Sequence, residues 1–245
     1  MPPENSRPAA VIFDMDGVLV DSNPFHLQKW VDLLTKHHIP FKPEELPGQV
    51  LGHRNDTAFR YFFGPNLTAT QRHELSEELE ATFRRVFKPH VKPLPGLPKL
   101  IEECYSAGVP MAVASSAMRK NVEFVVDGLG FRRYFRCLVT GDEVTRPKPD
   151  PEIYLRTARA LGADPTECAA FEDSFVGIEA AKRAGMKCVA IASTFPAEAL
   201  RERTQADLII PSFEGMTLRS VQRLFSVNTD QPEEAGGTYT DRHKL

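Results

Sequence analysis

The sequence predicts an α/β protein in which helices cover both faces of a parallel sheet and a helical segment follows the first strand. From about residue 98 to residue 225, short apolar runs alternate with helical patterns, and most of these helices end at a glycine. This alternation is typical of right-handed βαβ units, which build parallel sheets. No β-rich run occurs between residues 21 and 90, so that stretch is predicted to be helical.

The first strand is predicted from the apolar run at residues 9–13, which ends abruptly at Asp14-Met15-Asp16-Gly17. Carboxylates are costly to remove from water, so packing alone does not explain two of them here. They fit a strand that opens into a cleft holding a cation, at the sheet edge where ligands bind in such folds. Gly17 would let the backbone turn beside the ligand. For this motif alone, an aspartate-rich turn is the alternative.

The helical segment begins at Asp21-Ser22-Asn23-Pro24, because a capping residue followed by proline favours a helix start. Residues 44–63 predict short helices around the loop at residues 52–55. A longer helix is predicted from about residue 70 to residue 87, where an apolar residue recurs every fourth position from Leu75 to Phe87. Four prolines within residues 89–98 indicate the linker that returns to the sheet.

The remaining elements follow in alternation. Strands are predicted at residues 111–115, 137–141, 168–172, 187–192 and 207–211, and helices at residues 98–107, 118–129, 151–161, 174–184 and 215–225. The core is therefore predicted to comprise residues 9–20 and 91–226, and the helical insert residues 21–90. The polar residues 227–245 are predicted to form a mobile tail outside the fold.

Composition and charge disfavour several classes of protein. The 245 residues carry a net charge of −3, which argues against nonspecific binding to nucleic acid or to a membrane surface. No run approaches the roughly 18 apolar residues of a membrane span, and the first eight residues lack the apolar core of a signal peptide. The four cysteines are far apart, which favours free thiols in a reducing compartment. We therefore expect a cytoplasmic protein.

Polar residues gather where further predicted strands end. Ser115-Ser116 closes one strand, and its hydroxyl and N–H groups suit an oxyanion, although a pair of helix caps is the alternative. Lys148 lies between two prolines that stiffen its loop, and a surface turn is the alternative. Glu172-Asp173 closes another apolar strand. Two facing carboxylate pairs would repel unless a cation neutralised them, and all-oxygen ligands indicate Mg²⁺.

In this order the four stretches resemble the four motifs of the haloacid dehalogenase superfamily of phosphotransferases. The motifs are Asp14-Met15-Asp16-Gly17, Ser115 after an apolar strand, Lys148 in Lys-Pro-x-Pro, and Glu172-Asp173. Asp-Gly-Val-Leu-Val-Asp-Ser, followed by His26 and Trp30, and Phe-Glu-Asp-Ser-x-x-Gly-Ile resemble more closely the beta-phosphoglucomutase-like branch. The resemblance covers residues 9–225 and implies a Rossmann-like core, with residues 21–90 as a helical cap domain.

The resemblance implies a role for each motif. Asp14 would be the nucleophile that forms an aspartyl phosphate, and Asp16 the general acid and base. Dehalogenases of the superfamily lack the second aspartate, so its presence favours phosphate chemistry. The groups implied as Mg²⁺ ligands are Asp14, the main-chain carbonyl of Asp16, Asp173 and, directly or through another group, Glu172. The groups implied to hold the phosphoryl oxygens are Ser115, the N–H of Ser116, and Lys148.

The resemblance also implies that the cap domain selects the substrate. The loop Gly52-His53-Arg54-Asn55 offers a hinge glycine, a cation and hydrogen-bonding groups, although an exposed helix start is the alternative. His26 matches a family histidine that can interact with the acid/base aspartate, and a surface histidine is the alternative. Sugar mutases of this branch carry a cap lysine that reaches the active site, and without gaps that position falls on Leu79. Losing this cation should weaken the binding of a bisphosphate.

These expectations favour a Mg²⁺-dependent phosphatase of a small phosphorylated metabolite, such as a sugar or polyol phosphate. A sugar phosphomutase of the beta-phosphoglucomutase type is the first alternative, and a catalytically inactive ligand-binding relative is the second. A phosphonate-cleaving relative is disfavoured, because that chemistry uses a Schiff-base lysine in the cap. We expect a monomer or weak homo-oligomer that acts on a small phosphate ester and binds neither nucleic acid nor membrane.

Overall fold

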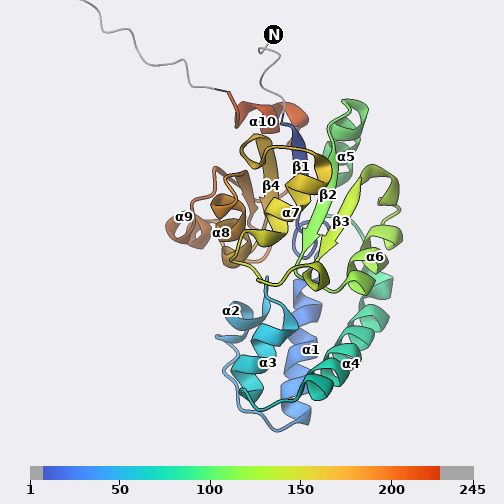
Figure 1. The fold of residues 1–245 in the computed structure, drawn as a ribbon, viewed down its shortest axis with the longest axis vertical. Coiled ribbons are helices and arrows are strands. Elements are labelled where there is room, and N and C mark those ends of the chain that lie inside the picture. The colour runs from blue at the N-terminus through green and yellow to red at the C-terminus, as the bar shows by residue number, and fades with distance from the viewer. Residues whose placement is uncertain (1–7, 227–245) are drawn as a thin grey trace, which may run out of the picture.

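The computed structural model describes residues 8–226, so the tail predicted at residues 227–245 lies outside the described residues. Within that range the strands form one parallel sheet in the order β3-β2-β1-β4-β5-β6 (Figure 1). The strands are β1 (Ala10–Phe13), β2 (Met111–Ser115), β3 (Cys137–Thr140), β4 (Cys168–Glu172), β5 (Lys187–Ile191) and β6 (Leu208–Ile210). The strand formed first along the chain, β1, therefore lies in the middle of the sheet.

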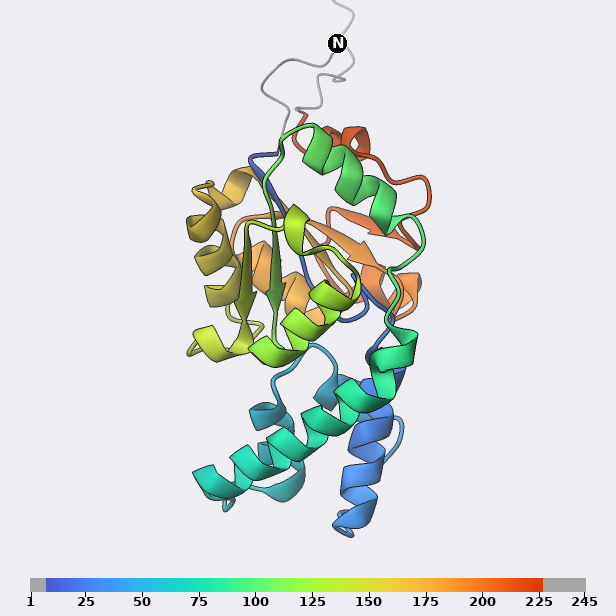
Figure 2. The same ribbon diagram turned by 90° about the vertical axis from the view of Figure 1, so that its right-hand side faces the viewer.

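Helices cover both faces of the sheet, as Figures 1 and 2 show. Successive side chains of a strand point to opposite faces, so Val11 and Phe13 pack on one side and Ala10 and Ile12 on the other. The first side is covered by α5 (Leu97–Ser106), α6 (Arg119–Gly128) and α10 (Leu218–Arg223). The second side is covered by α7 (Glu152–Leu161), α8 (Phe175–Arg183) and α9 (Ala197–Arg203).

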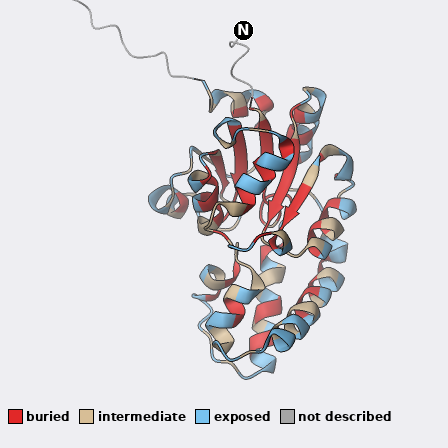
Figure 3. Ribbon diagram, viewed as in Figure 1, coloured by how far each residue is buried: buried red, intermediate tan, exposed pale blue. Residues whose placement is uncertain are grey.

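The two faces of the sheet differ in the size of their side chains. The rings of Phe13 and Phe171 stack with centroids 5.1 Å apart on the side of α5, α6 and α10. The opposite face of β2 carries Ala112 and Ala114. Small side chains let helices approach a sheet closely, while large rings supply most of the buried apolar area on the other side. All four residues of β1 are fully buried between these layers (Figure 3).

The first four helices after β1 form a separate group below the carboxyl edge of the sheet in Figure 1. They are α1 (Asn23–Lys36), α2 (Leu46–Val50), α3 (Asn55–Phe63) and α4 (Ala69–Phe87). This group has an apolar core of its own, in which Trp30, Phe59 and Leu79 are buried. Thr68 and Gln71 form a capping box that fixes the start of α4.

The chain leaves the sheet and returns to it at neighbouring points, because Val20 forms a β-bridge with Pro93. This pairing agrees with a cap domain between about residues 21 and 90, although the boundaries of the domains stay predictions. Among residues 8–226, every helix is too short or too polar to cross a lipid bilayer.

The elements predicted for residues 98–225 are found, with ends that differ from the predicted ones by at most three residues. Helix α9 was not predicted. It spans seven residues and buries only Leu200, so its sequence shows too little apolar periodicity to distinguish it from a loop. Short 3-10 helices also occur, at Lys88–His90, Arg132–Tyr134, Gly141–Glu143 and Pro165–Glu167.

Candidate active site

The residues of the four motifs meet at the carboxyl edge of the sheet. Asp14 follows β1 directly, Ser115 is the last residue of β2, and Glu172 is the last residue of β4. Because β1 lies between β2 and β4, these parallel strands deliver the three side chains to one place. Lys148 reaches the same place from the loop between β3 and α7.

Lys148 is the cation at the centre of this group. Its Nζ lies 2.6 Å from Oδ1 of Asp14, 2.6 Å from Oε1 of Glu172 and 3.3 Å from the carbonyl oxygen of Ala114. The residue is only 3% exposed. Burial opposes the charged ammonium, but the two carboxylates outweigh it and raise the pKa of Lys148. The side chain is therefore a permanent positive charge beside Asp14.

Glu172 is held by hydrogen bonds on both carboxylate oxygens. Oε1 accepts from the Tyr154 hydroxyl at 2.7 Å as well as from Lys148, and Oε2 accepts from the N–H groups of Asp173 and Ser174. A Cβ atom at Gly177 would come within 2.0 Å of Oε1, so only glycine fits there at the start of α8. The sequence did not predict a role for Tyr154, which is fully buried in α7.

Three carboxylates converge beside this lysine. Oxygen atoms of Asp14, Glu172 and Asp173 lie within 4.8 Å of one another, and all three residues are buried. Burial and the neighbouring negative charges raise the pKa of Asp14 to about 7 and that of Asp173 well above its usual value. One lysine balances only one of the three negative charges. The donor set therefore fits a hard divalent cation, which binds oxygen ligands and would restore neutrality.

Two further residues that the sequence did not reveal hold Asp173 in this cluster. Nδ2 of Asn23, in the first turn of α1, donates to Oδ2 of Asp173 at 2.8 Å, and the hydroxyl of Thr194 donates to the same oxygen. Gly17 has φ of +72°, and a Cβ there would lie 2.0 Å from Oδ2 of Asp173. Glycine at this position thus serves the turn, which the motif predicted, and also the close approach of the Asp173 carboxylate, which it did not.

Asp16 lies in the same loop as Asp14 and Gly17. Its carboxylate accepts hydrogen bonds from residues at the start of α1 rather than from Lys148. Its Oδ1 accepts from the hydroxyl of Ser22 at 2.5 Å and from Nε2 of His26 at 2.8 Å. The His26 ring stacks on Phe83 of α4, with centroids 4.1 Å apart. Although burial opposes ionisation, His26 lowers the pKa of Asp16. The two aspartates of the motif therefore sit in opposite electrostatic environments, which suits different chemical roles.

The two serines at the end of β2 make different contacts. Oγ of Ser115 accepts from the N–H of Ala117 at 3.1 Å, as expected for a residue that organises a turn before a helix. Oγ of Ser116 donates to the carbonyl of Gly52 at 3.0 Å, which links the sheet edge to the cap loop. That the Ser115 hydroxyl and the Ser116 N–H bind phosphate stays a prediction.

The predicted cap loop, residues 52–55, lies over the sheet edge. Arg54 donates from Nη1 to the carbonyl of Val144 at 3.1 Å, and its Nη2 lies 3.3 Å from Oδ2 of Asp56. Asn55 donates to Ser76 and Glu80 of α4. Burial lowers the pKa of His53. Arg54 thus contacts the core through Val144 and an acid through Asp56, and a role in substrate binding stays a prediction.

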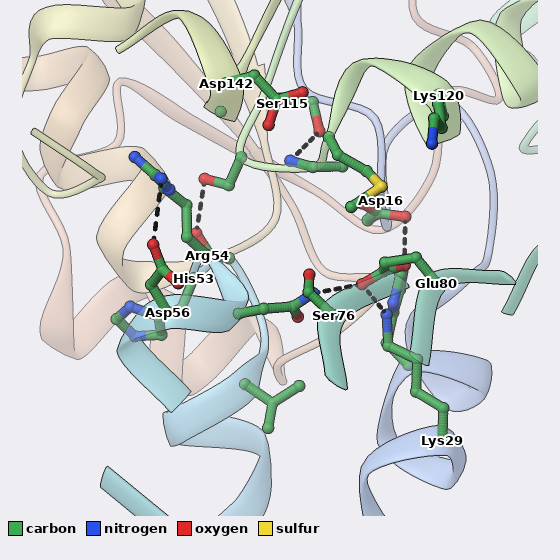
Figure 4. A pocket seen from close by; sticks show the side chains of 18 of the residues that line it. Asp16, Lys29, His53, Arg54, Asp56, Ser76, Glu80, Ser115, Lys120 and Asp142 are labelled. Atoms are coloured by element: carbon green, nitrogen blue, oxygen red, sulfur yellow. Dashed lines mark hydrogen bonds and ion pairs between the residues drawn. The ribbon is translucent and has the colours of Figure 1, made fainter. Parts of the chain in front are cut away.

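A cavity of about 670 Å³ separates the cap helices from the sheet edge (Figure 4). Its lining includes Asp14, Asp16, Asp173, Ser115, Ser116, His26 and all four residues of the cap loop. From α4 it includes Ser76 and Glu80, whereas Leu79 is buried in the apolar core of the cap. Glu80 lies 2.6 Å from Nζ of Lys29 and accepts from Nδ2 of the core residue Asn121 at 2.5 Å.

Comparison with known proteins agrees with this geometry. The sequence profile of the family described as "Haloacid dehalogenase-like hydrolase" matches residues 11–191. The chain is 32% identical over 210 residues to a validoxylamine A 7'-phosphate phosphatase of Streptomyces hygroscopicus subsp. limoneus, covering 81% of this chain and 91% of that protein. It is 31% identical over 183 residues to a fructose-1-phosphate phosphatase of Escherichia coli, covering 75% of this chain and 96% of that protein.

The fold has close relatives among solved structures. The beta-phosphoglucomutase of Clostridium difficile superimposes with a TM-score of 0.76 at 23% identity, over 89% of this chain and 96% of that one. At that identity the likeness concerns the fold alone. The family profile and the two phosphatases show that the chain belongs to the haloacid dehalogenase-like hydrolase family.

Proposed function

We propose that the protein is a phosphatase of small phosphorylated metabolites, most simply sugar or polyol phosphates, and that Asp14 is its nucleophile. The observation that carries the proposal is the pair of contrasting aspartates. Asp14 is paired with the buried Lys148, whereas Asp16, two residues later, is paired with His26. The two relatives at about 30% identity, which are named as phosphatases, support this assignment.

In the proposed reaction, a carboxylate oxygen of Asp14 attacks phosphorus, and the bond from phosphorus to the leaving oxygen breaks. Asp16 gives a proton to that oxygen, so the alcohol leaves neutral. Asp16 then takes a proton from a water molecule, which attacks the phosphoryl group on Asp14 and restores the free carboxylate as phosphate departs. Lys148, Ser115 and the N–H of Ser116 would stabilise the negative oxygens of the phosphoryl group.

Asp16 has to bind a proton before it can act as the acid. Its lowered pKa means that the carboxylate is ionised in the resting protein at neutral pH. A phosphate monoester beside it brings negative charge, which raises the pKa of a neighbouring carboxyl group. His26, 2.8 Å away, lies close enough to exchange a proton with it. We propose that binding of the substrate protonates Asp16.

The cation that fits the three carboxylates is proposed to be Mg²⁺. Asp14, Asp173 and the main-chain carbonyl of Asp16 would hold it, with Glu172 directly or through another group. When bound, the ion supplies positive charge that neutralises the phosphoryl oxygens. We expect no phosphate release in excess chelator, recovery on addition of Mg²⁺, and inhibition by Ca²⁺, which accepts more ligands at longer distances. Full activity in excess chelator would refute this site.

Hydrolysis is favoured over a mutase reaction by the charges around the cavity. Lys29 is paired with Glu80, Arg54 with Asp56 and Lys120 with Glu77, so these cations are balanced. Among the described residues that line the cavity, Arg72 is the cation without a carboxylate partner. A mutase must also hold a second phosphate, which needs uncompensated positive charge at the distal end.

Phosphorus NMR tests this choice directly. The protein is mixed with beta-glucose 1-phosphate and a trace of glucose 1,6-bisphosphate, and both products are followed together. We expect free phosphate, and stoichiometric formation of glucose 6-phosphate without phosphate release would establish the mutase instead. Release of phosphate from any aryl phosphate excludes a catalytically inactive relative.

We further propose a cytoplasmic location, because all four cysteines are unpaired. A monomer or weak homo-oligomer is proposed, acting on a small phosphate ester without binding nucleic acid.

A further inference from the structure

A group of polar side chains lines the part of the cavity formed by the cap helices. Lys29 comes from α1, Asn55 from the start of α3, and Ser76 and Glu80 from α4. Oε1 of Glu80 lies 2.6 Å from Nζ of Lys29 and 2.6 Å from Nδ2 of Asn55. In Figure 4, Glu80 lies between Lys29 and Asp16, so this group borders the residue proposed to protonate the leaving oxygen. We call Asn55, Ser76 and Glu80 the cap polar cluster.

The three residues of the cap polar cluster line the cavity and have hydrogen-bonding capacity that is not used within the protein. Oε1 of Glu80 accepts two hydrogen bonds, but Oε2 accepts one, from Asn121 at 2.5 Å, and a carboxylate oxygen can accept two. Within residues 8–226, no hydrogen bond involves Oδ1 of Asn55, and the Ser76 hydroxyl accepts from Asn55 without donating to any acceptor. A carboxylate, an amide oxygen and a hydroxyl proton are therefore available together.

The charge of this region is balanced, and this limits what it can bind. Glu80 is 4% exposed and Lys29 is 6% exposed, and each neutralises the other. An additional phosphate placed there would meet the carboxylate of Glu80, which already neutralises its partner Lys29. The pKa of Glu80 is lowered: burial raises it, but Lys29, His26 and the hydrogen bonds from Lys29 and Asn55 together lower it more. Uncharged hydroxyl groups carry no such penalty, because each can donate to one oxygen of the cluster and accept from a neighbouring hydroxyl.

We propose that Glu80, with Asn55 and Ser76, determines substrate specificity by binding the hydroxyl groups of an uncharged polyol leaving group. The inference rests on the proposed phosphatase function and narrows it to monophosphates of polyhydroxylated alcohols, with bisphosphates disfavoured. The cavity has a volume of about 670 Å³, which is typical of sites that bind ligands much larger than phosphate.

The test compares a polyol substrate with one that has no hydroxyl groups. Glucitol 6-phosphate and 4-nitrophenyl phosphate share the phosphate but differ in the leaving group. For Glu80→Gln we expect kcat/KM on glucitol 6-phosphate to fall by about 10-fold to 100-fold, the usual effect of losing a hydrogen bond to a charged group. On 4-nitrophenyl phosphate we expect a change below about 3-fold, because no cluster contact to that leaving group is lost.

Two further variants keep the test independent of misfolding. Ser76→Ala removes one donor of the cap polar cluster and leaves the contact of Glu80 with Asn121 in place, so a smaller selective loss of about 3-fold to 10-fold is expected. Glu78→Gln is the matched control, since Glu78 lies on the same helix but pairs with Lys36 at the surface. It should leave both substrates unaffected.

Equal losses on the two substrates, or no loss on either, would overturn the assignment of Glu80. Wild-type hydrolysis of 4-nitrophenyl phosphate without hydrolysis of glucitol 6-phosphate would overturn it as well, while leaving the phosphatase function in place. Binding can also be measured without turnover, by saturation-transfer NMR of glucitol 6-phosphate in the presence of the full chain. Transfer to the polyol protons in the wild type and its loss in Glu80→Gln support the proposal, and equal transfer in both refutes it.

Discussion

Replacing Asp14 by asparagine should abolish turnover and, in metal-free buffer, make the folded protein more stable. Asp14 is 7% exposed and shares its surroundings with the carboxylates of Glu172 and Asp173. Burial and the charges of Glu172 and Asp16 outweigh Lys148 and raise the pKa of Asp14 from 3.8 to about 7. A rise of about three pKa units corresponds to about 4 kcal/mol against the ionised form in the folded state. Asparagine removes this penalty without changing the shape of the side chain.

Part of the gain in stability of Asp14→Asn is offset, because asparagine is a weaker hydrogen-bond acceptor for Lys148 than the carboxylate is. A hydrogen bond to a charged group contributes about 1.5–3 kcal/mol. We therefore expect a net stabilisation of about 2 kcal/mol at pH 7, or about 4–8 °C in Tm for a chain of this size. Differential scanning calorimetry with chelator measures it, and phosphate release from 4-nitrophenyl phosphate with Mg²⁺ measures the loss of activity.

The pH dependence gives a sharper check on the cause. An acid whose pKa is higher in the folded state destabilises the fold above its unfolded pKa, and the effect grows until pH passes the folded value. For Asp14 this window runs from about pH 4 to about pH 7. The advantage of Asp14→Asn should therefore increase across it and then level off. A variant less stable than the wild type at pH 7, or a difference independent of pH, would refute the reasoning.

Further predictions concern other parts of the site and the core. Asp16→Asn should reduce kcat/KM by about 10²–10⁴-fold on alkyl phosphates but much less on 4-nitrophenyl phosphate, whose leaving group needs no proton; equal losses would contradict the acid role. Asn121→Ala should destabilise the protein by about 1–3 kcal/mol in urea unfolding, because it removes one hydrogen bond from the buried Glu80 and one from the half-buried Arg84. The exposed control Lys120→Ala should change stability by less than about 1 kcal/mol. Burial raises the pKa of Cys104 and Cys168 to about 12, so neither should react with iodoacetamide at pH 8 until the chain unfolds; rapid labelling in the native state, seen by mass spectrometry, would contradict this.

The positions of Asp14, Ser115 and Glu172 were accessible from the sequence because the physical signal was local. Each lies at or next to the end of an apolar run, and parallel strands bring their carboxyl ends to one edge. The same signal would have found Thr194, which follows β5 and hydrogen-bonds Asp173. Nevertheless, no role was predicted for Thr194 from the sequence.

Other parts of the site could not be predicted, because they depend on which elements face each other. Tyr154 occupies a position of α7 that an apolar side chain could fill equally well, and only the packed structure shows its hydroxyl beside Glu172. Glu80 follows Glu77 and Glu78 in a run of similar residues, yet it alone of the three is buried. Helical periodicity predicts which face a residue occupies, but it does not identify a partner such as Asn121 on another helix.

The central position of β1 has a consequence for how the chain folds during synthesis. Its two strand partners begin at Met111 and Cys168, so about a hundred residues must follow β1 before its first neighbour exists. Helices α1–α4 emerge in this interval, and their own apolar core allows them to fold early. Meanwhile β1 is an apolar strand with two open edges, which is prone to incorrect pairing. The slow step of folding should therefore be the late capture of β1 by β2 and β4, and mutations that weaken this capture should reduce the yield of native protein before they reduce activity.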